Sequence, residues 1–138
     1  MIGIVIVAHG GLAREYLAAL EHVVGRSPMT ATVAIDAEDS CGTKQAEVDA
    51  AVASVDRGDG VVVVTDMHGS TPANLAIVAC GKGPKRRAVH GANLPMLVKL
   101  AKNRERPIDE AVASALTAGR KYINCTDGFG PNGTSVPF

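Results

Sequence analysis

Aliphatic and β-branched residues form three short, nearly uninterrupted runs in this 138-residue chain. Each run has the length of a strand, and the third run, "GVVVVTD", starts at a glycine. Continuous apolar runs are typical of strands that are covered on both faces. We predict strands over these runs, at residues 2–8, 30–36 and 60–66, and a fourth strand over 85–91, which has its charged residues at the start.

Between and after these runs, apolar residues recur every three or four positions, which is helical spacing. In the first such segment, the positions that would share one face include Leu12, Tyr16 and Leu20, and Gly25 is a plausible end. For the third helix, Thr71 is predicted as the N-cap, Pro72 as the first helical residue and Gly81 as the end. The predicted helices are 11–25, 43–58, 71–81, 93–104 and 107–123.

Strands that alternate with helices predict an α/β fold, because parallel strands need long crossovers. We expect a flavodoxin-like three-layer sandwich around a mainly parallel sheet of four strands in the order 2-1-3-4. One domain would cover residues 1–121. For residues 122–138, which are rich in glycine and proline, two alternatives stay open: disorder, or a fifth, antiparallel edge strand.

The charge of the chain limits the classes of partner it would bind, and its cysteine content indicates the cellular compartment. Fourteen basic and fourteen acidic side chains give no net charge, so nothing favours binding to nucleic acid or to anionic lipid. No apolar run is long enough to cross a membrane, and no basic segment precedes the first apolar run. Three cysteines without CxxC spacing indicate a reducing compartment. We therefore expect a cytoplasmic protein without membrane insertion.

Candidate catalytic side chains follow the first and third predicted strands. His9 follows the first strand and Asp66 follows the third, and strands 1 and 3 are neighbours in the predicted order. Open α/β sheets bind ligands beyond the carboxyl ends of their strands at this point. Asp66 would hold one ring nitrogen of His9 and leave the other as a nucleophile. Gly69, Ser70 and Thr71 would form an anion site at a helix N-terminus, so phosphoryl transfer through His9 would need neither metal nor cofactor.

With these residues identified, the chain resembles the enzyme IIA domain of the mannose family of the bacterial phosphoenolpyruvate-dependent sugar phosphotransferase system. Three stretches carry the resemblance: "IGIVIVAHGGLAREYLAALEHVVG", "GVVVVTDMHGSTPANLA" and "GANLPMLVKL". The second is similar to the family pattern Asp-x-x-Gly-Gly-[Ser/Thr]-Pro-x-Asn. The third matches Gly-x-Asn-[Leu/Ile]-Pro-Met-[Leu/Val].

The resemblance implies that the protein is a phosphotransferase with a phosphohistidine intermediate at His9. The phosphoryl group would come from the histidine-containing phosphocarrier protein and pass to a IIB partner, with Asp66 orienting His9 and residues 69–71 binding the phosphoryl group. The resemblance also implies a homodimer in which a C-terminal edge strand takes part. Because no IIB or membrane domain follows here, a regulatory phosphorelay is an alternative to sugar uptake.

Two positions depart from the family pattern. Ser70 stands where the family often has a second glycine, and a serine there would be strained if the position needed a positive φ. His68 stands where a bulky aromatic or apolar residue is common, which would alter the docking surface.

Two further functions compete with the phosphocarrier. His9, His68 and His90 all lie near predicted strand ends and would together bind a metal ion, as in small tetrapyrrole chelatases. Alternatively, a non-catalytic module would use the anion site to sense a phosphometabolite, with His9 as a hydrogen-bond donor only.

Overall fold

The computed structural model describes residues 1–126 and contains one sheet of four parallel strands. Its order is β2-β1-β3-β4, as predicted. Val7 of β1 lies opposite Val33 of β2 and Thr65 of β3, so these strands end close together. The strands are β1 (Gly3–His9), β2 (Thr30–Ile35), β3 (Val61–Thr65) and β4 (Arg86–His90).

Helices form at all five predicted places, and most of their ends lie within two residues of the prediction. They are α1 (Leu12–Val24), α2 (Cys41–Val55), α3 (Thr71–Cys80), α4 (Leu94–Lys102) and α5 (Ile108–Lys121). The N-cap of α3 was predicted one residue too late: Ser70 is the N-cap and Thr71 is the first helical residue. Serine and threonine both suit an N-cap, so spacing alone could not choose between them.

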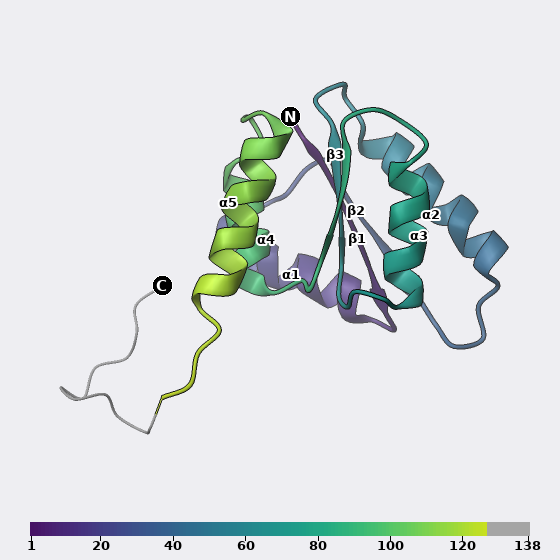
Figure 1. Cartoon of the computed structure of the whole chain (residues 1–138), viewed down its shortest axis with the longest axis horizontal. Helices are drawn as coiled ribbons and strands as arrows, with labels where there is room; N and C mark the ends of the chain where they lie inside the picture. Colours follow the sequence, from purple (N-terminus) through teal and green to yellow (C-terminus); the bar gives the residue numbers. More distant parts are fainter. Residues whose placement is uncertain (127–138) are drawn as a thin grey trace.

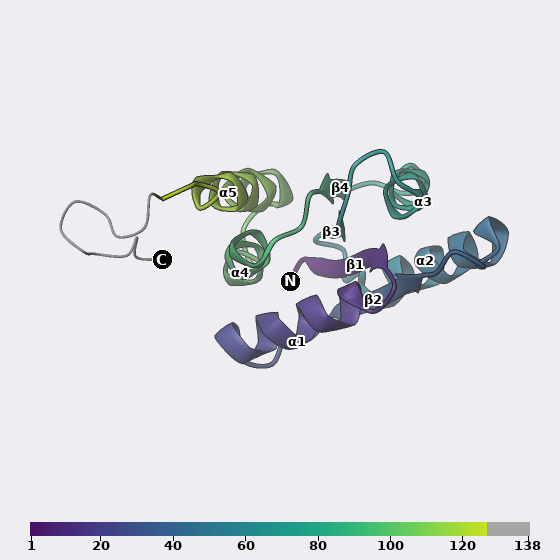
Figure 2. The same cartoon turned by 90° about the horizontal axis from the view of Figure 1, so that it is seen from below.

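The helices cover the sheet in two layers, which completes the predicted three-layer sandwich (Figure 1). α1, α4 and α5 lie against one face, and α2 and α3 lie against the other (Figure 2). Successive residues of β1 alternate between the two cores: Ile4 and Ile6 face the first, whereas Val5 and Val7 face the second. Both faces are therefore buried, which explains the uninterrupted apolar runs.

The amino end of the sheet is closed by a buried arginine, Arg104, which follows α4. Its Nε donates a hydrogen bond to the carbonyl oxygen of Ile2 at 2.7 Å. Its Nη2 donates to the carbonyl oxygen of Met29 at 2.7 Å, and Nη1 donates to that of Pro28. Burial lowers the pKa of this guanidinium, with Glu105 acting in the opposite direction. Arg104 thus ties the start of β1 to the segment that leads into β2.

The last helix, α5, ends at Lys121, where the predicted domain also ends. Residues 122–126 contain no strand. The predicted alternatives for the tail fall largely on residues 127–138, which lie outside the described part of the chain. Within residues 1–126, no helix is both long and apolar enough to span a bilayer.

Candidate active site

Adjacent strands bring His9 and Asp66 together at the carboxyl end of the sheet. The Nδ1 atom of His9 lies 2.8 Å from Oδ2 of Asp66. The same carboxylate oxygen accepts a hydrogen bond from the backbone N–H of His9 at 3.0 Å. The predicted contact between imidazole and carboxylate is therefore present, and within residues 1–126 it leaves Nε2 of His9 without a carboxylate partner.

The electrostatics keep the Asp66 side chain ionised. Burial by itself would raise its pKa, but the hydrogen bonds and the charge of His9 outweigh burial and bring the pKa of Asp66 below its usual value. The side chain of Asp66 is only 10% exposed, whereas that of His9 is 49% exposed. An ionised carboxylate accepts hydrogen bonds only, so Nδ1 of His9 carries the proton. In the neutral tautomer that this contact selects, the lone pair lies on Nε2.

The turn after β3 leads directly into the N-terminus of α3. Gly69 has a φ of +80°, whereas Ser70 has an extended backbone with a φ of −96°. The positive φ thus falls on the glycine, and the serine that departs from the family pattern is not strained. The Ser70 hydroxyl donates to the carbonyl oxygen of Met67 at 2.5 Å and does not cap the helix. The first turn of α3 therefore has no side-chain cap.

A pocket of about 330 Å³ lies beside the imidazole and includes residues from α2, which were not predicted to lie at the site. His9 and Thr71 line it on one side, and Asp39, Cys41 and Lys44 line it on another. Lys44 lies 2.9 Å from Glu47 and 3.7 Å from Asp39, and the hydrogen bond with Glu47 raises its pKa most. The predicted strand order could have indicated that this part of the chain lies at the site. β2 borders β1, so the loop after β2 must lie near His9.

Tyr16 is a second residue near the site that sequence reasoning assigned only to the packing of a helix. Its hydroxyl donates to the carbonyl oxygen of Ala92 at 3.0 Å, which joins α1 to the loop after β4. Burial raises the pKa of Tyr16, and the charge of Asp66 raises it further. Tyr16 is therefore neutral and holds two elements of the carboxyl end together.

His68 and His90 stack on each other instead of forming a metal site with His9. Their ring centroids are 4.7 Å apart at an interplanar angle of 16°. Nδ1 of His90 lies 2.6 Å from the Thr65 hydroxyl, and burial followed by the charge of His68 lowers the pKa of His90. Among residues 1–126, no three histidine, cysteine or acidic side chains are grouped to hold a metal ion. The three-histidine site of the chelatase alternative is not formed.

Comparison with known proteins now identifies the family. A family model described as the PTS system fructose IIA component, EIIA-man, matches residues 3–116. The chain belongs to the EIIA-man family. This confirms the predicted resemblance and makes the protein a phosphotransferase-system component of the mannose-type IIA class.

Individual known proteins are similar to this chain, two of them in fold as well as in sequence. The mannose/sorbose-specific IIA subunit of Enterococcus faecalis is 30% identical, with a TM-score of 0.83 over 91% of this chain and 95% of that one. EIIA from Streptococcus agalactiae is 25% identical, with a TM-score of 0.82 over 91% and 97% of the two chains. The mannose-specific EIIAB component of Escherichia coli K12 is 29% identical over 124 residues, which is 88% of this chain. The match covers 38% of that longer relative.

Proposed function

We propose that His9 is a phosphocarrier residue that receives a phosphoryl group from the histidine-containing phosphocarrier protein and passes it to a IIB partner. The observation that carries the proposal is the 2.8 Å contact between Nδ1 of His9 and Oδ2 of Asp66. With Nδ1 held by an ionised carboxylate, the exposed ring keeps its lone pair on Nε2. A histidine oriented in this way is prepared to act as a nucleophile.

In the transfer step, Nε2 of His9 forms a bond to phosphorus while the bond between phosphorus and the donor nitrogen breaks. The electron pair of the broken bond returns to the donor imidazole. Asp66 stabilises the positive charge that develops on the ring of His9 as Nε2 becomes substituted. Transfer to a IIB partner is the same exchange in the opposite direction, with the partner's nucleophile attacking phosphorus and Nε2 leaving.

The transferred group needs compensation for its negative charge. The uncapped N-terminus of α3 lines the same pocket as His9 through Thr71. Backbone N–H groups at such a terminus point outward and carry partial positive charge. We assign residues 69–71 to the phosphoryl site, with the Thr71 hydroxyl and N–H as donors. Ser70 acts through its backbone, because its hydroxyl already donates within the turn.

The deciding experiment is phosphorylation with labelled phosphoenolpyruvate, enzyme I and the phosphocarrier protein. Wild-type protein should gain one acid-labile phosphate, and His9→Ala should gain none. His68→Ala is the matched control, since it removes another exposed histidine at the same end of the sheet, and it should be labelled normally. Normal labelling of His9→Ala would disprove the assignment. A wild-type protein that binds phosphometabolites but gains no label would instead be a sensor.

The outer edge of β4 supports a homodimer. Within the described residues, β4 pairs with β3 alone, so its other edge is open to a further strand. Sedimentation of the full chain and of a chain that ends at residue 126 tests this. A dimer that becomes a monomer on truncation supports pairing through the tail. A full-length monomer contradicts the homodimer.

A further inference from the structure

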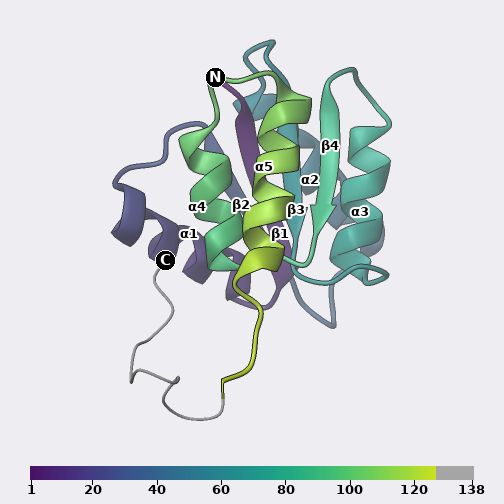
Figure 3. The same cartoon turned by 60° about the vertical axis from the view of Figure 1, so that its left-hand side comes forward.

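A second hollow surface lies on the layer of α1, α4 and α5, apart from the His9 pocket. One part, of about 400 Å³, is lined mainly by apolar side chains, including Leu94, Pro95 and Val98 of α4. An adjoining part, of about 370 Å³, runs along α5 and shares Lys99, Ala118 and Tyr122 with the first. Together they form one groove between α4 and α5, which lie side by side in Figure 3. We call it the α4–α5 groove.

The groove contains accessible apolar surface. Val23, near the end of α1, lines the groove and is 52% exposed. An isolated exposed valine needs no explanation. Here, however, it lies at a concave surface with partly exposed Leu94 and Val98, and apolar patches with polar rims are typical of interaction sites.

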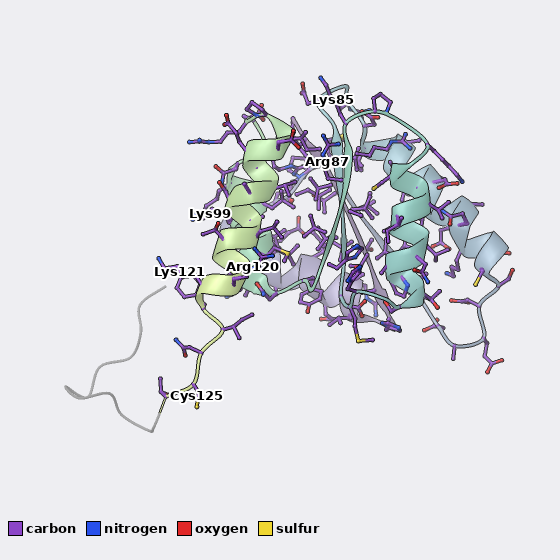
Figure 4. The ribbon with its side chains drawn as sticks, viewed as in Figure 1. Lys85, Arg87, Lys99, Arg120, Lys121 and Cys125 are labelled. Carbon is purple, nitrogen blue, oxygen red and sulfur yellow. The ribbon has the colours of Figure 1, made fainter. Side chains whose placement is uncertain are left out.

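Every charged side chain that lines the groove is basic. Lys99, Lys102 and Lys121 lie on its rim, and no aspartate or glutamate does. None of these lysines forms an ion pair with another described residue, and Lys121 lies 5.4 Å from the centre of the Tyr122 ring. Figure 4 shows Lys99 and Lys121 on the outer side of this layer, away from Lys85 and Arg87.

Helix dipoles account for only part of this arrangement. Lysines in the last turn of a helix favourably face its negative end, and Lys99, Lys102 and Lys121 all occupy last turns. That effect does not require an apolar floor, nor that last-turn lysines from two different helices line a single hollow. A protein with no net charge has therefore concentrated unpaired positive charge around accessible apolar surface.

We propose that the α4–α5 groove is a docking site for an acidic, amphipathic helix of a partner protein. Apolar side chains of that helix would cover the floor, and its carboxylates would meet the three lysines. A symmetric contact between two copies would bring like charges together, which disfavours a second copy of this chain as the occupant. The apolar floor likewise distinguishes the groove from a nucleic-acid surface. The site is separate from the phosphoryl transfer proposed for His9.

The test uses a fluorescein-labelled amphipathic helical peptide with leucine on one face and glutamate on the other. Its binding to the full chain is followed by fluorescence anisotropy. A peptide with lysine in place of each glutamate is the control ligand and should not bind. Lys99→Glu/Lys102→Glu/Lys121→Glu should weaken binding at least about tenfold. Val23→Gln should weaken it about threefold without affecting the fold, because the side chain is already half exposed.

The matched control is Arg57→Glu/Lys85→Glu/Arg106→Glu, which changes net charge equally at exposed positions outside the groove. It should bind the peptide within about twofold of wild type, since distant exposed charges are screened. Equal weakening by both triple variants, or no binding by wild type, would overturn the proposal. So would a wild-type dimer that Val23→Gln dissociates, because the occupant would then be a second copy. Phosphorylation at His9 should be unchanged in all these variants, which separates this result from that of the phosphocarrier proposal.

Discussion

At the amino end of the sheet, the guanidinium of Arg104 is buried and donates hydrogen bonds to three backbone carbonyls. At the carboxyl end, the imidazole of His9 is half exposed and contacts the side chain of Asp66. Glycines at the two ends also differ in the space around them. A Cβ on Gly60 would lie 2.6 Å from the carbonyl oxygen of Lys85, whereas one on Gly69 would meet nothing within 4 Å.

The two ends of the sheet therefore differ in their expected roles: the amino end stabilises the fold, and the carboxyl end carries the reactive groups. The amino end is packed and fully hydrogen-bonded around Arg104, so substitutions there should unfold the protein. The carboxyl end leaves a nitrogen lone pair and helix-end amides accessible, so substitutions there should slow chemistry and leave the fold intact. A parallel sheet allows this division because all of its strand ends of one kind lie on the same side.

Replacing Arg104 should give the largest loss of stability. Arg104→Met keeps an apolar stem but removes the charged donor from the carbonyl oxygens of Ile2, Pro28 and Met29, which should cost about 3–5 kcal/mol of unfolding free energy. Urea denaturation measures this loss. Arg106→Met, an exposed neighbour, should change stability by less than about 0.5 kcal/mol. Equal losses of unfolding free energy in the two variants would show that the hydrogen bonds of Arg104 do not stabilise the amino end.

Gly60 and Gly69 both have a positive φ, so replacing each with alanine compares the amino end of the sheet with its carboxyl end. Gly60→Ala combines a φ of +105° with a clash against backbone and should cost about 3 kcal/mol. Gly69→Ala, with a φ of +80° and open space, should cost only about 1 kcal/mol. Thermal unfolding of both variants gives the difference. A cost for Gly69→Ala as large as that for Gly60→Ala would show that the carboxyl end is not open.

Asp66→Asn should affect the rate of transfer more than the fold. The amide cannot stabilise the charged ring of His9, and phosphorylation should slow about 100-fold, or ~2.7 kcal/mol in the barrier. Rapid-quench measurement of label transfer gives the rate. Asp36→Asn removes a carboxylate that lines the same pocket without touching His9, and should change the rate less than about twofold. If the two variants behave alike, the contact between Asp66 and His9 has no role in catalysis.

The smallest effect is the dependence of stability on pH through Asp66. Because its pKa is lowered in the folded state, Asp66 contributes stability that is fully present above the unfolded value of about 3.9. That contribution is lost as pH falls through the lower, folded pKa. Stability of wild type relative to Asp66→Asn should therefore decrease on acidification. If the difference in unfolding free energy between wild type and Asp66→Asn stays constant from about pH 6 to pH 3, ionisation of Asp66 does not stabilise the fold.

Much of the site could be predicted because the chemistry lies at strand ends. The runs 2–8 and 60–66 are apolar enough to identify strands, and the residues that follow a parallel strand must lie at its carboxyl edge. Once strands 1 and 3 are neighbours, His9 and Asp66 come together. The contribution of α2 was not predicted: Cys41 and Lys44 line the same pocket as His9 through the pairing of β2 with β1.

Local sequence by itself determined the elements of this protein, the turn at residues 69–71 that leads into α3, and the family, because hydrophobic periodicity and short motifs act over a few residues. Tertiary structure alone decided that His68 stacks on His90 and that Arg104 closes the amino end. It also decided that three lysines of α4 and α5 surround one apolar groove. These features depend on side chains from elements far apart in the chain, and their contacts arise only from the packing of layers.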